Sequence, residues 1–349
     1  LPLKFWDEEP KLKRDGTPII KYGRRVFEYK PNNEYLYNFL AKKGFGLLDM
    51  PSEKKGEGLV HVQENIVAPV EFRHVNKFIK SYLRQHNVIE FLTQGSHIDL
   101  LNAFHRSPNF SEVSMGNLPL LDLDFTDFGA DHQLMFFQNA VWRVEDDKIE
   151  VIPPKDCNVY VWENEVRKHN VELLPDFWTV SKDDNGTWNL DIKDTRCLFL
   201  RFALNASRVH WRVELEDRLD QFPDKHLYLE ENQFNIAGPL LSDHEIWEQK
   251  QHLLNKITSF GYLLHHYKNP ARAWVVWAVD YNIQNREDIN VGTGKYMFYS
   301  AMEHFLNHES FEGRNAKLTQ NPHIFENVTE HTDLLFVDDA YKYIEFDFF

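Results

Sequence analysis

Two short stretches of the chain carry the residue types of a nucleotide site. The first is the glycine turn Gly292-Thr293-Gly294-Lys295, which runs through Tyr296 into a segment with a helical pattern. Backbone N–H groups of a glycine-rich turn at the start of a helix can surround a phosphate group. A lysine in that turn can reach the β- and γ-phosphates of a nucleoside triphosphate. The candidate nucleotide-binding residues are therefore Gly292, Thr293, Gly294, Lys295 and Tyr296.

The second stretch is an apolar run, Leu334 to Val337, that leads directly into Asp338 and Asp339. A buried strand that ends in an aspartate can hold the Mg²⁺ ion that bridges the phosphates of ATP. Asp338 lies 43 residues after Lys295, which leaves room for one helix, one short strand and two loops. An apolar run before two aspartates is also the pattern of a strand followed by a polar turn, but the order and spacing of both stretches favour the nucleotide site.

Two other groups of residues have patterns that chemistry could use. Asp122 and Asp124 have the spacing that places two carboxylates on one face of a strand, as metal-dependent polymerases and primases require. Two turn carboxylates are the favoured interpretation, because no second acidic strand follows. A basic stripe of a predicted helix can contact nucleic-acid phosphates, although a solvated helix face is the more common meaning of such a pattern. Its residues are Arg73, Lys77, Lys80 and Arg84.

Composition narrows the classes of protein that the chain can belong to. The 349 residues carry a net charge of −15, whereas sequence-independent DNA binding depends on Lys and Arg. Any contact with nucleic acid must therefore use a local basic patch. The two cysteines, Cys157 and Cys197, are too few for a disulfide framework and favour a reducing, intracellular setting. No apolar run approaches the ~20 residues of a membrane span and no signal peptide is visible, so we expect no membrane association.

Hydrophobic periodicity and turn residues predict the elements that must position these side chains. Up to residue 214, the expected elements are a strand at Arg25–Tyr29, a helix over Tyr35–Lys42 that Gly44 caps, strand material in Leu59–Val70 broken at Glu64-Asn65, helices over Phe72–His86 and Val88–Phe104, a β-meander of Leu134–Phe137, Ala140–Glu145 and Lys148–Ile152, a hairpin of Phe177–Val180 and Trp188–Ile192, and a buried helix over Cys197–Trp211.

Beyond residue 214 the pattern changes to a charged segment and then to an α/β pattern. The expected elements are a linker over 215–240, a helix from the capping box at Ser242 to Asn269-Pro270, an apolar strand at Ala273–Val279, a helix over Tyr296–Leu306 and a last strand from Asp333. The fold class expected is a multidomain α/β and α+β protein. Residues 1–214 form an α+β domain with a β-meander, 215–269 a linker and helical connector, and 270–349 an incomplete P-loop α/β domain.

The two nucleotide motifs, with the segments between and after them, resemble the ATPase domain of superfamily-three, virus-type hexameric helicases. The chain is more similar still to the helicase half of primase-helicases from phages and mobile elements of Bacteroidetes. The segments that carry the resemblance are Gly292-Thr293-Gly294-Lys295, Phe311-Glu312-Gly313-Arg314-Asn315, His323 to Thr329, Leu334 to Asp339, Phe346 to Phe349 and, in the meander, Phe136 to Val141.

This resemblance implies ATP-driven unwinding or translocation of DNA during phage-type replication in the cytoplasm of a bacterial host. Lys295 would contact the β- and γ-phosphates, Asp338 would hold Mg²⁺, and Asp339 would orient the attacking water. The cofactors implied are ATP and Mg²⁺. The partners implied are single-stranded or duplex DNA, bound weakly by this chain alone, and further copies of the chain in a hexameric ring.

The sequence departs from the family pattern at positions that matter for hydrolysis. Tyr296 stands where the motif has a Ser or Thr that ligates Mg²⁺, and Ile289 stands where the longer motif has its first glycine. The family's sensor residue, pore hairpin and arginine finger follow the second motif, so we expect the ATPase domain to be incomplete here. The alternative hypothesis is a non-catalytic replication or scaffold module with a degenerate P-loop.

Overall fold

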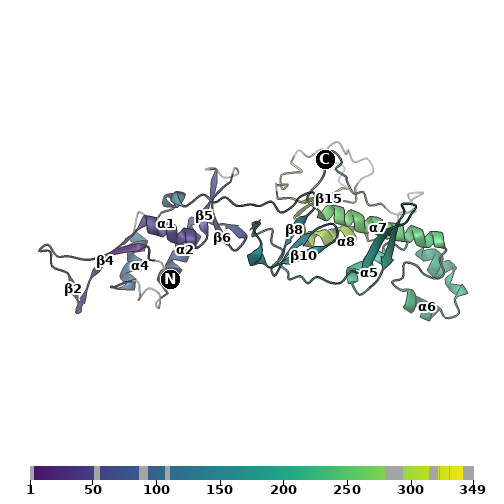
Figure 1. The fold of residues 1–349 in the computed structure, drawn as a ribbon, viewed down its shortest axis with the longest axis horizontal. Helices are drawn as coiled ribbons and strands as arrows, with labels where there is room; N and C mark the ends of the chain where they lie inside the picture. Colours follow the sequence, from purple (N-terminus) through teal and green to yellow (C-terminus); the bar gives the residue numbers. More distant parts are fainter. Residues whose placement is uncertain are drawn as a thin grey trace. The chain divides into compact units, whose positions relative to one another are not determined.

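The chain folds into a mixture of helices and several small sheets (Figure 1). The structure is a computed structural model that describes residues 4–50, 56–85, 93–106, 111–279, 294–313, 321, 323–329 and 331–340. The expected α+β multidomain class is therefore confirmed at this level. Among the described helices, none combines the length and the apolar character needed to cross a bilayer.

Contacts divide the chain into two compact units. The first unit contains 1–127, 136–142 and 152–169, and the second contains 128–135, 143–151 and 170–349. Both predicted boundaries, at residues 214/215 and 269/270, lie inside the second unit. The three-part division of the chain remains a prediction.

The first unit combines a long β-ribbon, a four-stranded sheet and three described α-helices. The ribbon pairs β1 with β4, and the sheet has the order β11-β7-β6-β5, in which only the β11–β7 pair is parallel. The elements are β1 Trp6–Pro10, β2 Ile20–Lys21, β3 Arg24–Arg25, β4 Phe27–Pro31, α1 Asn33–Lys42, β5 Phe45–Asp49, β6 Glu57–Gln63, β7 Ile66–Pro69, α2 Phe72–Leu83, α4 His97–Arg106, η1 Val113–Asn117, η2 Pro154–Asp156 and β11 Val161–Trp162.

Hydrophobic residues at helical spacing explain why α1, α2 and α4 pack together. Val75, Ile79 and Leu83 of α2 are fully buried in an aromatic core that includes Phe5 and Phe39, whose ring centroids lie 4.4 Å apart. This aromatic core also covers one face of the four-stranded sheet. The other face is covered by the segment 121–125, which supplies Leu121, Leu123 and Phe125. Each face of this sheet therefore has its own apolar cover.

A β-meander follows, as predicted, with the strand order β10-β9-β8. Its strands are β8 Gln133–Phe136, β9 Val141–Val144 and β10 Ile149–Ile152. Phe137 donates its N–H to Ala140 O over 2.9 Å and closes the first turn. The residues of these strands are divided between the two units.

The second unit is a helical cluster with a hairpin and a small parallel sheet. Its apolar core joins α5, α7, α8 and β13 through Leu190, Leu204, Leu253 and Phe298. The elements are β12 Trp178–Lys182, β13 Trp188–Ile192, α5 Leu198–Asn205, the π-helix η3 Val213–Asp217, η4 Leu219–Gln221, α6 Lys225–Asn232, α7 Asp243–Leu264, α8 Lys295–Ser300, η6 Ala301–His304, β14 His308–Glu312 and β15 Leu334–Asp338.

The predictions of helix caps and turns from local sequence patterns are confirmed. Ser242 Oγ accepts from Glu245 N and the Glu245 carboxylate accepts from Ser242 N, which confirms the capping box that opens α7. Asp183 accepts the N–H groups of Asn185 and Thr187 in the predicted hairpin turn. Gly44 follows α1 with a φ of +86°, in the left-handed conformation expected after a helix.

Several expectations about element bounds were wrong. The predicted helix Val88–Phe104 is not continuous, because residues 93–96 are not helical and α4 runs from His97 to Arg106; its predicted start at Val88 lies outside the described residues. The buried helix from Cys197 ends at Asn205, where the chain turns, instead of reaching Trp211. The helix from Ser242 ends at Leu264, before Asn269.

Two expectations failed for whole segments. The linker predicted over 215–240 contains η4 and α6, and its Tyr228 and Ile236 are buried. The segment predicted as a strand at Ala273–Val279 has no regular secondary structure and pairs with no described strand, and its Trp274 and Val275 are 70% and 81% exposed. An apolar run specifies burial only when another element supplies the covering surface.

Candidate functional site

The lysine of the glycine turn begins a short helix that is anchored in the core of the second unit. Gly294 is the N-cap of α8 with a φ of +81°, a conformation that favours glycine. A Cβ at this position would also meet Phe202 Cζ at 2.8 Å. Phe298, one turn later, is buried and stacks on Phe199 with ring centroids 5.3 Å apart. The position of Lys295, at the first residue of α8, is therefore fixed by packing on both sides.

The two carboxylates stand at the end of a parallel strand pair. β15 pairs with β14 so that Asp338 is opposite Glu312, and Gly313 N donates to Asp338 O over 2.7 Å. Asp339 has a φ of +49°, which turns the chain at the end of the strand. Aspartate is among the residues that adopt this left-handed conformation most readily. The expected strand that delivers an aspartate to its carboxyl end is present, but its residues are half-buried or exposed rather than buried.

One ring contact connects the two motifs. The Tyr296 ring packs edge-on against Phe336 of β15, with ring centroids 5.6 Å apart and planes at 64°. Phe336 and Asp338 are two residues apart on one strand, so their side chains point to the same face. The first turn of α8 therefore lies on the strand face that carries Asp338. The structure thus brings Tyr296 to the strand of the two carboxylates, while Gly292 and Thr293 lie outside the described residues, as does Ile289.

The residue chemistry here lacks one usual ligand of Mg²⁺. Tyr296 carries its hydroxyl on a rigid ring that packs on Phe336, so it does not offer the short hydroxyl that Mg²⁺ takes from Ser or Thr. Among the described residues, no group of three or more His, Cys, Asp or Glu side chains could hold a metal. Mg²⁺ needs only one or two carboxylates when phosphates and waters complete its coordination, so Asp338 remains the residue that would hold it.

The basic stripe forms on α2 as its spacing predicts. Arg73, Lys77 and Arg84 are exposed and Lys80 is half-buried, all on the side away from the buried Val75. Arg73 Nε lies 2.7 Å from Glu71 Oε2, so part of its charge is already paired within the protein. Whether the stripe contacts nucleic acid remains a prediction.

Asp122 and Asp124 lie in an extended segment that belongs to no described strand. Both are exposed, whereas the alternate residues Leu121 and Leu123 pack on the sheet. Asp124 accepts the N–H of Thr126 over 2.9 Å, which holds the pKa of its carboxyl below the usual range. This is the local turn role that the sequence favoured over a metal-binding pair.

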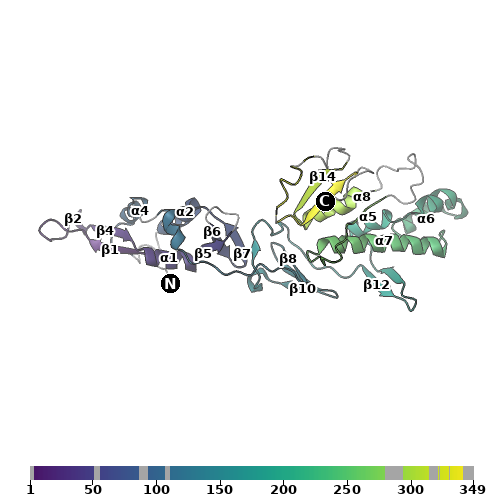
Figure 2. The same cartoon turned by 90° about the horizontal axis from the view of Figure 1, so that it is seen from above.

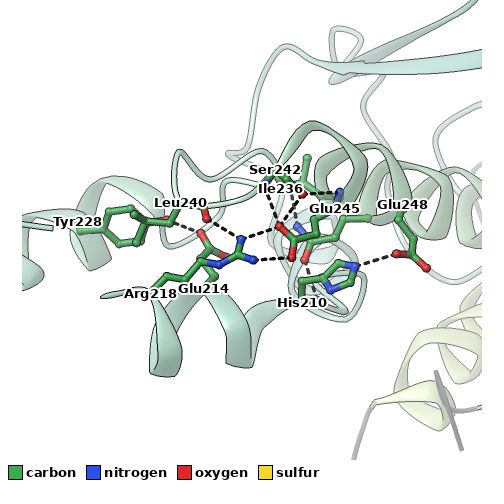
Figure 3. A network of polar contacts seen from close by, with 10 residues as sticks. His210, Glu214, Arg218, Tyr228, Ile236, Leu240, Ser242, Glu245 and Glu248 are labelled. Atoms are coloured by element: carbon green, nitrogen blue, oxygen red, sulfur yellow. Dashed lines mark hydrogen bonds and ion pairs between the residues drawn. The ribbon is translucent and has the colours of Figure 1, made fainter. Parts of the chain in front are cut away.

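A buried polar network joins residues before and within the segment interpreted as a linker, and the sequence patterns do not predict it (Figure 3). Glu214, on the π-helix η3, has no exposed surface, and its two oxygens accept from Arg208 Nη2 at 2.5 Å and from the Tyr228 hydroxyl at 2.6 Å. Arg208 Nη1 also donates to the carbonyl oxygens of Asn232 and Gln233 at the end of α6. Burial and the Glu214 carboxylate raise the pKa of the Tyr228 phenol.

Further polar contacts join the same region to α7 (Figure 3). Arg218 forms a bidentate pair with Glu245 at 2.7 and 3.0 Å, and donates to Leu240 O at 3.0 Å. The Arg218 guanidinium and the Ser242 N–H lower the pKa of Glu245 to about 2. His210 Nε2 lies 2.8 Å from Glu248. These contacts fasten the segment after α5 to the start of α7. The helix signal available in the sequence was Asp224, which caps α6 by accepting from Leu227 N.

The first unit holds a cavity of about 350 Å³ that involves none of the predicted site residues. The turn between β6 and β7, the end of β8 and η2 contribute to its walls, which include Asn65, Phe136 and Pro154. Asn65 Oδ1 is buried and accepts no hydrogen bond from any described residue, while Asn65 Nδ2 donates to Val159 O over 3.2 Å. The cavity is close to the lower size limit of ligand pockets.

Comparison with known proteins adds no assignment to these observations. No protein-family model matches the chain, and neither the curated proteins nor the solved structures contain a match. The candidate site is therefore defined by its own residues.

Proposed function

We propose that the chain is an ATP-dependent DNA helicase or ATPase of the primase-helicase type, which acts in phage or mobile-element replication in the bacterial cytoplasm. The observation that supports this proposal is the contact of Tyr296 with Phe336, because it joins the glycine–lysine turn to the strand that ends in the two aspartates. The resemblance in sequence supplies the activity, the DNA partner and the ring of identical subunits.

In this proposal each motif has one task. Lys295 and the N–H groups at the start of α8 would bind the β- and γ-phosphates. Asp338 would hold Mg²⁺ and Asp339 would orient the water that attacks the γ-phosphate. Bound Mg²⁺ would neutralise the charge that develops on the phosphates. The P-loop ATPase domain of 270–349 belongs to the same proposal.

The alternative is a non-catalytic replication or scaffold module whose P-loop has degenerated. The observation that favours it is again the Tyr296 ring, which stands where the resembling motif has a magnesium-ligating hydroxyl and packs edge-on against Phe336. Such a module would bind ATP through Lys295 with little dependence on Mg²⁺ and would turn over little or no ATP.

Calorimetric titration of ATP, with and without Mg²⁺, tests the nucleotide site. Lys295→Ala removes a charge-assisted contact and should weaken ATP binding about tenfold or more. Asp338→Asn should leave metal-independent binding intact and abolish any gain from Mg²⁺. Lys193→Ala and Asp191→Asn are matched controls, because both side chains are exposed on or beside β13 of the same unit. Binding by Lys295→Ala at the wild-type affinity would refute the site.

Phosphate release in the presence of single-stranded DNA separates the two candidate functions. A DNA-stimulated rate that Asp339→Asn removes would support the helicase. ATP binding without measurable turnover would support the non-catalytic module.

A further inference from the structure

The first unit carries a projecting β-arm, defined here as residues 6–31. Its base is the antiparallel ribbon of β1 and β4, and beyond Pro10 and Phe27 the ribbon divides into two short hairpins. The first turns at Asp15-Gly16, where Lys13 N donates to Thr17 O over 2.8 Å. The second is the β2–β3 hairpin. Figures 1 and 2 show that β2 and the adjoining turn extend away from α1, α2 and α4 of the same unit.

The two hairpins concentrate positive charge in a chain that is acidic overall. Between residues 11 and 25 there are six cationic side chains and one carboxylate, against a net charge of −15 for the whole chain. The cationic residues are Lys11, Lys13, Arg14, Lys21, Arg24 and Arg25, and all of them are exposed. The carboxylate is Asp15, which is already used by Thr17 N and Oγ1 at 2.9 and 2.6 Å. The patch therefore attracts an anionic partner.

The tip of the second hairpin presents an aromatic ring at a conformational cost. Lys21 pairs with Arg24, so Tyr22 and Gly23 form a two-residue turn, and both have positive φ values, of +49° and +75°. That pattern is a type I′ turn, in which asparagine is the preferred first residue. A bulky side chain with positive φ is rare, and such strain is retained chiefly at functional positions. The Tyr22 side chain is fully exposed, so packing within the protein does not account for it.

The arm is held firmly at its base, which is what a docking element requires. Trp6 is buried in the core of the first unit and Phe5, just before it, packs on Phe39. Tyr29 of β4 is buried too, and its hydroxyl accepts from Thr93 Oγ1 over 3.1 Å. The exposed cations therefore lie on a ribbon whose base is anchored in the core of the first unit.

We propose that the β-arm binds single-stranded nucleic acid. The cations of the two hairpins contact the phosphate backbone, and Tyr22 stacks on an unpaired base. A groove or ribbon that combines Lys and Arg with an exposed aromatic ring is the general way in which proteins hold single strands without sequence preference. This inference does not use the nucleotide site, and it places the nucleic-acid contact on the arm rather than on the stripe of α2.

Fluorescence anisotropy with labelled oligothymidine, measured without ATP over a range of salt concentrations, tests the arm. In the arm variant Lys21→Gln/Arg24→Gln/Arg25→Gln, the slope of log affinity against log salt should fall by about 2, which is about 0.7 for each lost phosphate contact. The matched control is Lys42→Gln/Lys43→Gln/Lys168→Gln, which removes the same charge from exposed lysines of the same unit. The control should bind like the wild type.

The aromatic contact has its own variants. Tyr22→Asn keeps the turn, removes the ring and should weaken binding about fivefold or more, whereas Tyr22→Phe should bind like the wild type. Since asparagine suits this turn, Tyr22→Asn should melt no lower than the wild type, which excludes misfolding.

Three outcomes would overturn the inference. The first is equal losses in the arm variant and in the control, since any surface charge would then count equally. The second is binding of duplex as tight as that of the single strand, with no effect of Tyr22→Asn. The third is loss of binding only when the α2 residues Arg73, Lys77 and Arg84 are changed to Gln, which would place the contact on the stripe.

Discussion

Glu214 offers the most direct test of the energetics of the second unit. Its carboxylate is fully buried between the Arg208 guanidinium, at 2.5 Å, and the Tyr228 hydroxyl, at 2.6 Å. In Glu214→Gln the amide can still accept from Arg208 and donate to the Tyr228 oxygen. The number of hydrogen bonds stays the same while the negative charge is lost. The change in the free energy of unfolding therefore measures the cost of a buried guanidinium without a counter-ion.

The magnitude follows from the burial of both partners. The side chain of Arg208 is 7% exposed and that of Glu214 is 0% exposed, so water cannot solvate the guanidinium that is left without its counter-ion. Removing one partner of a buried ion pair costs about 3–5 kcal/mol. Glu248→Gln is the matched control, because the His210–Glu248 pair has a similar separation of 2.8 Å but both side chains keep contact with solvent. A partly exposed pair of this kind contributes about 0–1 kcal/mol.

Hydrogen exchange measured by mass spectrometry reports the effect where it arises. Peptides from α6 and from the start of α7 should exchange faster in Glu214→Gln, because Arg208 also binds the carbonyl oxygens at the end of α6. Peptides of the first unit should be unchanged. If the free energy of local opening of α6 in Glu214→Gln were within about 1 kcal/mol of the wild-type value, the buried pair would not be what stabilises this segment.

Three further predictions concern single positions. Tyr296→Ser should increase the gain in ATP affinity that Mg²⁺ gives in calorimetric titrations, and an unchanged dependence on Mg²⁺ would show that this position does not face the metal. Because the pKa of Glu245 is lowered to about 2 in the fold, the stability that its pairing with Arg218 gives is present above about pH 5 and is lost as the pH falls towards 2. Thermal melts should show a loss of about 1–2 kcal/mol, after allowance for solvent screening, that is absent in Glu245→Gln. Gly44→Ala should destabilise the first unit by about 2 kcal/mol or more in urea titrations, because φ is +86° and a Cβ would lie 2.0 Å from Val62 O; a smaller loss would mean that this turn can relax.

The sequence predicted those elements whose signals are local. The capping box at Ser242 and the turn at Asp183 form hydrogen bonds between residues close in sequence. The apolar residues at helical spacing in α2 place one face of that helix in the core. Such signals depend on residues within one or two turns of each other. They remain valid whatever the rest of the chain does. The strands β1, β5 and β11 of the first unit, which have no such local signal, were not predicted.

The segment before α7 was misinterpreted because its core is polar. Charged residues in a sequence indicate solvent exposure, yet Glu214 and Arg208 are buried because each neutralises the other. That compensation joins residues that turn towards each other only after the chain leaves α5. The exposed run Ala273–Val279 is the opposite error, since an apolar pattern predicted a paired strand and no described strand pairs with it.

The two motifs of the candidate nucleotide site could be predicted from the sequence, but the contact between them could not. Glycine and lysine at the start of a helix, and aspartates at the end of a strand, are each recognised from consecutive residues. The packing of Tyr296 on Phe336 depends on how α8 lies against β15, and residue spacing contains no such information. The contact also bears on the proposed chemistry, because a ring packed on Phe336 would not supply the metal-ligating hydroxyl that the resembling motif has at that position.

The β-arm shows why net charge is a poor guide to nucleic-acid binding. A charge of −15 excludes a protein whose whole surface attracts phosphate. At physiological ionic strength, however, exposed charges are screened beyond about 8 Å, so a strand bound at the hairpins experiences their cations far more strongly than the carboxylates of the rest of the chain. The carboxylates of the arm's base, such as Glu9 and Glu28, lie next to the hairpins, but six exposed cations against one carboxylate between residues 11 and 25 still form a separate basic site on an acidic protein. The same screening predicts that affinity falls with added salt at a rate set by the cations of the arm alone, and substitutions elsewhere on the acidic surface should leave that rate unchanged.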